Sequence, residues 1–243
     1  MDDRTFEQAA SIGATVVGVL SLLYAVAYLG ITPSDQRGDD VAKFYRSYLA
    51  HPAGLRMAAS CLLVSGLISG AVVVALIRRI RTSDGQSALS WAGMVAVVAG
   101  LATSAHGLAD LVGVDKLAHR YATGDATTRA AVAVAHVAPS SVDPRGLATF
   151  AAAGLVALAV GLALRASQPR LGWLGVVLGA DMVALFLANA VGIKALVLVT
   201  GGLASVVLGP MWWFGIGRLL WRPSTEAVAA PAPSVPRAAP VLG

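Results

Sequence analysis

Six long apolar segments, separated by shorter polar stretches, dominate the pattern of the chain. They cover residues 11–30, 55–77, 88–112, 147–164, 171–191 and 195–216. At about 1.5 Å per residue, each is long enough to cross the ~30 Å hydrocarbon core of a bilayer. Because lipid offers no hydrogen-bond partners, each segment must satisfy its own backbone amides as a helix. The pattern predicts an all-α, polytopic membrane bundle of six transmembrane helices.

The two longer loops, 31–54 and 113–146, each contain a second type of pattern. Apolar residues recur at helical spacing from Val41 to Leu49, with Asp39 or Asp40 as a cap and His51-Pro52 as the end. Residues 127–137 form a similar stretch before Pro139. We expect two short amphipathic helices on the outer membrane surface or on the rim of the bundle.

Composition supports the membrane interpretation. The chain is 57% hydrophobic and 13% charged, whereas soluble domains carry about 25% charged residues. Its net charge of +5 comes from Lys and Arg scattered between the apolar runs, so we expect the lipid bilayer, and no nucleic acid, as a partner. A single cysteine, Cys61, excludes an intrachain disulfide, a zinc–thiolate cluster and a covalent c-type haem site.

Basic residues near the helix ends predict the orientation. They crowd two short hairpins and follow the sixth apolar run, at Arg78, Arg79, Arg81, Arg165, Arg170, Arg218 and Arg222. The positive-inside rule places these segments, and therefore both termini, in the cytoplasm of a multi-pass plasma-membrane protein. The acidic start around Asp3 and Glu7 is unlike a signal peptide. We expect a cytoplasmic N-terminus over 1–10, a transmembrane domain over 11–221 and a disordered Pro/Ala-rich cytoplasmic tail over 222–243.

Asp181 is the sharpest candidate for chemistry. It lies near the middle of the fifth apolar run, and Lys194 lies roughly 20 Å away along the axis. Because an isolated carboxylate in hydrocarbon is costly, we expect Asp181 to face the bundle in its neutral form, near Ser205 or Ser65. One interpretation is a proton or cation site, and the other is a hydrogen bond that fixes helix packing.

A second candidate group lies toward the outer side. His106 and Asp110 share a face of the third apolar run, Tyr24 and Tyr28 share a face of the first, and Asn189 is at similar depth. Together they predict a polar pocket open to the outside. The His–Asp pair is also compatible with proton transfer, with two metal ligands helped by Asp115, His119 or His136, or with a plain polar helix end.

The amino-acid sequence contains none of three common catalytic or nucleotide-binding motifs. The chain has no H-E-x-x-H, no Walker A loop and no G-x-S-x-G, so we predict no cofactor and no metal. Gly66 and Gly70, with Ser65 and Ser69, indicate close helix packing, and Pro210 indicates a kink. A short W-x-G repeat at 90–95 and 172–177 suggests that runs two-three and four-five are parallel repeats.

Four short motifs resemble those of a known family. They are DVAKFYR at 40–46, RRIR at 78–81, PRLGWLG at 169–175 and GPMWW at 209–213. The family consists of six-helix integral membrane proteins from high-GC bacteria and carries only a domain-of-unknown-function label. The resemblance implies six helices and a plasma membrane, and it brings no catalytic residues with it.

Three functions are compatible with these patterns. The leading one is a non-enzymatic membrane protein that binds or moves a small solute, lipid or proton through an outward-facing polar pocket. The alternatives are an intramembrane enzyme that uses Asp181 or His106 as acid or base, and a structural or accessory subunit whose polar residues only pack helices.

Overall fold

The computed structural model describes residues 3–80, 86–138 and 142–222, and this part of the chain is helical without strands. Six of its helical segments are long and apolar enough to span a membrane, which confirms the predicted all-α bundle. The proposed tail 222–243 lies, apart from Arg222, outside the described residues. The first span is α1 (Asp3–Ala25) with the π-helical turn Val26–Ile31, the second is α3 (Ala53–Ile80), and the third is α4 (Gln86–Thr123). The fourth span is the π-helical turn Leu147–Ala152 with α6 (Ala153–Leu164), and the fifth is α7 (Pro169–Val191). In the sixth span, α8 (Lys194–Leu203) continues through the π-helical turn Ala204–Leu208 into α9 (Gly209–Trp221).

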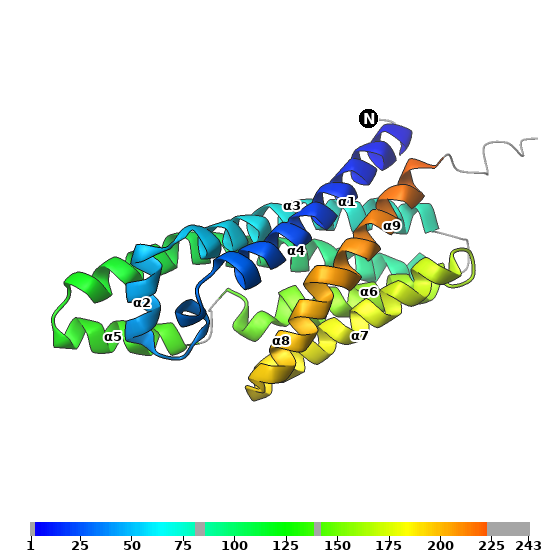
Figure 1. Cartoon of the computed structure of the whole chain (residues 1–243). Coiled ribbons are helices and arrows are strands. Elements are labelled where there is room, and N and C mark those ends of the chain that lie inside the picture. The colour runs from blue at the N-terminus through cyan, green and yellow to red at the C-terminus, as the bar shows by residue number, and fades with distance from the viewer. Residues whose placement is uncertain (1–2, 81–85, 139–141, 223–243) are drawn as a thin grey trace, which may run out of the picture.

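The six spans form a ring that follows the order of the chain. Each span packs against the next, and α9 packs back against α1. Figure 1 shows α1 and α9 side by side, with the start of α1 and the end of α9 at one end of the bundle. Because the ring is closed in this way, all six spans face one common interior.

Glycines bring the two hairpins of the ring into close contact. In the α3–α4 hairpin, a Cβ added to Gly66 would lie 2.5 Å from the carbonyl oxygen of Gly100. In the α6–α7 hairpin, a Cβ added to Gly179 would lie 2.5 Å from the carbonyl oxygen of Gly154. Only glycine allows backbones to approach so closely, which confirms the packing role predicted for Gly66. The repeat of the two hairpins stays a prediction.

A large apolar cluster closes the end of the ring at which α1 begins and α9 ends. Leu76, Leu164, Ile216 and Leu220 are almost fully buried there, and Trp212 packs against them. A second, smaller cluster lies at the opposite end, where Phe44, Tyr45, Tyr48, Ala118 and Val132 pack together. The interior of the ring therefore lies between two apolar layers of different size.

Two short helices form a cap at that opposite end, which we call the outer end. They are α2 (Val41–Ala50) and α5 (Ala126–Val137), and they match the two predicted amphipathic stretches. The Asp40 carboxylate accepts the backbone N–H of Lys43 at 3.0 Å, and the Asp125 carboxylate accepts that of Thr128 at 2.8 Å. These capping bonds lower the pKa of both carboxyl groups, because they stabilise the ionised form.

The long loop predicted from residue 113 onward is partly wrong. Helix α4 continues through Gly113 to Thr123, so it projects beyond the apolar run to the cap. The loss of hydrophobicity at 113 does not end the helix, because no proline or capping residue stops it there. A π-helical turn at Ala204–Leu208 precedes Pro210, whose missing N–H and bulky ring disturb the regular hydrogen-bond ladder as expected.

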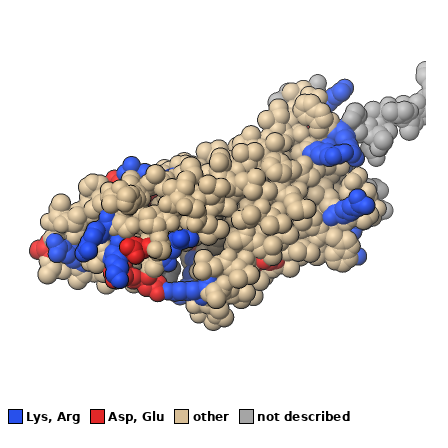
Figure 2. Space-filling view, viewed as in Figure 1, with Lys and Arg blue, Asp and Glu red and all other residues tan. Residues whose placement is uncertain are grey.

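Charged side chains gather at the two ends of the molecule (Figure 2). In this view Lys and Arg mark the end near the chain termini, while acidic and basic side chains mix at the outer end, and the wide middle is almost uncharged. This distribution is that of a protein whose middle lies in hydrocarbon and whose ends lie in water.

Candidate functional site

A large cavity occupies the interior of the ring. Its volume is about 760 Å³, and residues from all six spans line it. Sites for small organic molecules usually have volumes of roughly 300–1,000 Å³. Figure 2 shows a hollow on this face of the molecule, between the charged outer end and the uncharged middle.

The inner part of this cavity is apolar. Its walls come from the large apolar cluster that closes the other end of the ring. The residues concerned are Val73, Leu76, Val156, Val160, Leu178 and Trp212. Hydrocarbon is the chemistry that such walls accommodate, because the side chains of these residues, apart from the Trp212 indole N–H, offer no partner to a polar atom.

Polar residues line the outer part of the cavity, and most of them are those predicted from the sequence. Tyr24, Tyr28, His106, Asp110 and Asn189 all lie on its walls, and so does Ser205, deeper in the last span. The structure thus brings six of the seven candidate residues to one cavity. Their binding role stays a prediction.

His106 and Asp110 form the centre of this polar group. The Nε2 atom of His106 lies 3.5 Å from Oδ2 of Asp110, one helical turn further along α4. The Nδ1 atom of His106 is buried and has no hydrogen-bond partner among the described residues. On the first span, the rings of Tyr24 in α1 and Tyr28 in the π-helical turn stack with their centroids 5.9 Å apart. The cavity therefore offers the Asp110 carboxylate and phenolic hydroxyls to a polar ligand group, whereas the Nδ1 atom of His106 is enclosed by protein atoms.

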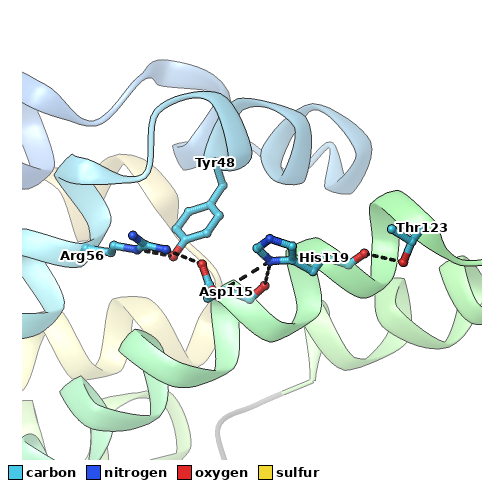
Figure 3. Close-up of polar contacts among 5 residues, drawn as sticks. All are labelled: Tyr48, Arg56, Asp115, His119 and Thr123. Carbon is cyan, nitrogen blue, oxygen red and sulfur yellow. Dashed lines mark hydrogen bonds and ion pairs between the residues drawn. The ribbon is translucent and has the colours of Figure 1, made fainter.

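Above this group, an ion pair ties α3, α4 and the cap together (Figure 3). Arg56 reaches from the start of α3 to the Asp115 carboxylate on α4, and its Nε donates to the Tyr48 hydroxyl at 3.3 Å. The Nδ1 atom of His119 lies 2.9 Å from the Asp115 carbonyl oxygen, within α4. Asp115 thus pairs with Arg56, and this ion pair connects α3 to α4 while Arg56 also reaches the cap.

Asn189 has a structural contact in addition to its place on the cavity wall. Its Nδ2 donates to the Arg145 carbonyl oxygen at 2.8 Å, and the Arg145 guanidinium donates to the Ala190 carbonyl. Arg145 has a φ of 56°, in the left-handed region that non-glycine residues rarely adopt. Both carboxylate oxygens of the buried Asp143 accept backbone N–H groups of the following turn, from Ala148 and Thr149. These bonds hold the turn at the cavity's outer rim.

The surroundings of Asp181 differ from those predicted. It does not line the cavity, and no hydrogen bond joins it to Ser205 or Ser65; the Ser65 hydroxyl instead donates to the Leu62 carbonyl within α3. The side chain is half-buried, and its Oδ2 atom is buried without a partner in the described part of the chain. Position along a helix predicts depth in the membrane but not direction around the helix axis, which tertiary packing decides.

Three residues at the outer rim were not identified from the sequence. They are Arg56, Asp143 and Arg145, and their partners lie on other elements. Arg56 gives one signal in the sequence, because it is a cation just inside the start of an apolar run. Within the described residues, no group of three or more His, Cys, Asp or Glu side chains lies close enough to hold a metal ion.

Comparisons with known proteins add no relative. No family model, no curated protein and no solved structure matches the chain. The function must therefore be argued from the cavity and the residues on its walls.

Proposed function

We propose that this integral membrane protein binds a small amphipathic molecule, with its hydrocarbon part in the inner cavity and its polar head near His106 and Asp110. The observation that carries this proposal is the division of one cavity into an apolar inner part and a polar outer part. An amphipathic ligand matches both parts at once, because each half of it meets surroundings of its own polarity.

The chemistry of the outer part favours a head that donates hydrogen bonds, such as a hydroxyl or an amine. The Asp110 carboxylate is 47% exposed and accepts hydrogen bonds, and the phenolic oxygens of Tyr24 and Tyr28 on the cavity wall accept them as well. Both basic residues at the rim already have partners, Arg56 on Asp115 and Arg145 on the Ala190 carbonyl.

A titration with a brominated alcohol tests binding. Bromine quenches tryptophan fluorescence at short range, and Trp212 is a buried residue of the inner cavity wall. The protein is prepared with Trp91, Trp173, Trp213 and Trp221 changed to Phe, so that only Trp212 reports. We expect 12-bromododecan-1-ol in lipid nanodiscs to quench Trp212 with saturation, as a binding site requires.

Glycine substitutions supply a matched control for this titration. Gly201 lines the cavity, and an added Cβ there meets only the Leu185 side chain, at 3.8 Å or more. Gly113 lies on α4 away from the cavity, and an added Cβ meets nothing within 4 Å. Gly201→Phe should place a ring in the cavity and weaken saturable quenching, whereas Gly113→Phe should leave it unchanged. Equal quenching of all three proteins would contradict the proposal.

We also propose that both termini lie in the cytoplasm of a plasma membrane, since the Arg-rich hairpins belong on that side. Exposed positions for labelling are Ser167 in the α6–α7 hairpin and Thr127 in α5. In a Cys61→Ala background, an impermeant thiol reagent applied to intact cells should label Thr127→Cys and not Ser167→Cys. The reverse pattern would invert the orientation.

A further inference from the structure

We infer that the cavity has a side entrance from the lipid, between the outer part of the first span and α8, through which an amphiphile with a hydrocarbon chain enters. This inference rests on the proposed function, because it names the route by which that ligand reaches its site. It goes further in stating that the ligand arrives dissolved in the membrane and not from water.

The first and last spans are in close contact only toward the end where the chain termini lie. The Ser11 hydroxyl donates to the Gly217 carbonyl at 2.7 Å, and a Cβ added to Gly18 would lie 2.8 Å from the Phe214 ring. Beyond Ser21 the two spans diverge: the outer part of the first span packs against α3, whereas α8 packs chiefly against α7. Figure 1 shows this divergence, with α1 and α8 directed away from each other.

Side chains on both edges of this gap face the cavity and the outside at the same time. Leu29 in the first span is 41% exposed, and Leu198 in α8 is 54% exposed, yet both line the cavity. A residue that borders an interior space and the outer surface together marks an opening between the two. Since both edges are apolar and belong to spanning segments, the opening faces hydrocarbon.

The backbone on both sides of the gap departs from regular α-helix. The first span ends in the π-helical turn Val26–Ile31, and α8 joins the π-helical turn Ala204–Leu208 just after Gly201 and Gly202. A Cβ added to Gly202 would meet nothing within 4 Å, so this stretch of α8 is loosely packed. Such segments are the ones in which an entrance can widen with little loss of contact.

Within the described part of the chain, one ion pair crosses the gap at its outer end. Lys194 at the start of α8 is bonded to Asp39 in the loop that follows the first span. Both side chains are more than half exposed, so the pair is weak and can open. This ion pair therefore limits how far α8 and the first span separate at the side entrance.

The rate of ligand entry tests this inference. The single-tryptophan protein, also carrying Cys61→Ala, is placed in nanodiscs and mixed in a stopped-flow instrument with vesicles containing 12-bromododecan-1-ol. In Leu29→Cys/Leu198→Cys, a flexible bis-maleimide links the two edges of the gap. We expect quenching of Trp212 to become about tenfold slower after linking, because a closed entrance limits the rate. The final extent of quenching should stay the same.

Control variants separate the entrance from other effects. Leu101→Cys/Leu108→Cys receives the same linker on the exposed face of α4 and should keep the original rate. Lys194→Ala removes the ion pair with Asp39 and should accelerate entry. Lys116→Ala should not, because Lys116 is an exposed lysine on α4 that takes part in no ion pair of the described residues.

Two results would overturn the inference, and they differ from each other. An unchanged rate after the gap is linked, with normal final quenching, would disprove the side entrance and leave the binding site intact. Absence of saturable quenching in the unlinked protein would disprove the proposed function and the entrance with it.

Discussion

The two ends of the helix ring contrast sharply. At the end near the chain termini, buried apolar side chains fill the interior, and Arg79 joins three spans. Its Nη1 lies 2.7 Å from the Glu7 carboxylate and 3.4 Å from the Leu220 carbonyl, and its Nη2 donates to the Arg222 carbonyl at 2.7 Å. At the outer end the spans separate around a cavity, and only short helices and exposed ion pairs cover it.

The two ends therefore have different roles, stability at one and ligand binding at the other. The filled end carries the packing that holds the ring together, because in lipid close van der Waals contact and hydrogen bonds between helices stabilise a bundle. The outer end gives up packing to leave room for a ligand. A cavity closed at one end favours a binding pocket over an open pore, since a pore must connect both sides of the membrane.

The largest expected difference between the ends comes from one leucine-to-alanine change made at each. Leu164 is almost fully buried at the filled end, outside the cavity wall, whereas Leu198 is 54% exposed beside the cavity. Leu164→Ala should lower the free energy of unfolding by about 4 kcal/mol, because it leaves a cavity in a packed core. Leu198→Ala should change it little. Thermal unfolding in detergent measures both, and equal losses would remove the contrast.

Ion pairs should give a smaller difference in the same direction. The Arg79 and Glu7 side chains are only 13% and 20% exposed, whereas those of Arg56 and Asp115 are 50% and 36% exposed. Arg79→Met should cost about 2 kcal/mol, because it removes charged hydrogen bonds from a buried site. Arg56→Met should cost at most about 1 kcal/mol, as exposed pairs do. A larger loss for Arg56→Met in the same unfolding assay would reverse the assignment.

The smallest effect concerns the cap and its response to pH. Burial lowers the pKa of His136, which contacts the Tyr45 hydroxyl at 3.2 Å, and burial raises the pKa of Tyr45 to about 12. Because the folded cap binds a proton on His136 less readily than the unfolded chain does, its stability falls as the pH drops through 6.5 and below.

Hydrogen exchange, corrected for the intrinsic effect of pH, measures this response. Protection of α2 and α5 should decrease between pH 7.5 and pH 5.5, while protection near Leu76 should not. His136→Phe should remove the decrease, since its ring can pack on Phe44 without titrating; His119→Gln, at an exposed position of α4, should retain it. A decrease that persists in His136→Phe would assign the response to another group.

Sequence reasoning succeeded where a pattern is local. Apolar length predicts the six spans, helical spacing predicts α2 and α5, and matched depth groups His106 and Asp110 with Tyr24 and Tyr28. It failed where the outcome depends on tertiary packing. The pairing of Arg56 with Asp115, 59 residues away, and the direction of Asp181 around its helix have no local signal. The cavity itself arises from the divergence of the first span and α8, which no single segment encodes.

Native mass spectrometry of the protein released from mild detergent tests the central claim most directly. If the cavity holds an amphiphile, the unmodified protein should retain an adduct with the mass of a small lipid-like molecule. Gly201→Phe should retain less of that adduct, because its side chain occupies part of the cavity, and Gly113→Phe should retain it in full. An unmodified protein without such an adduct, or an adduct undiminished in Gly201→Phe, would contradict the account.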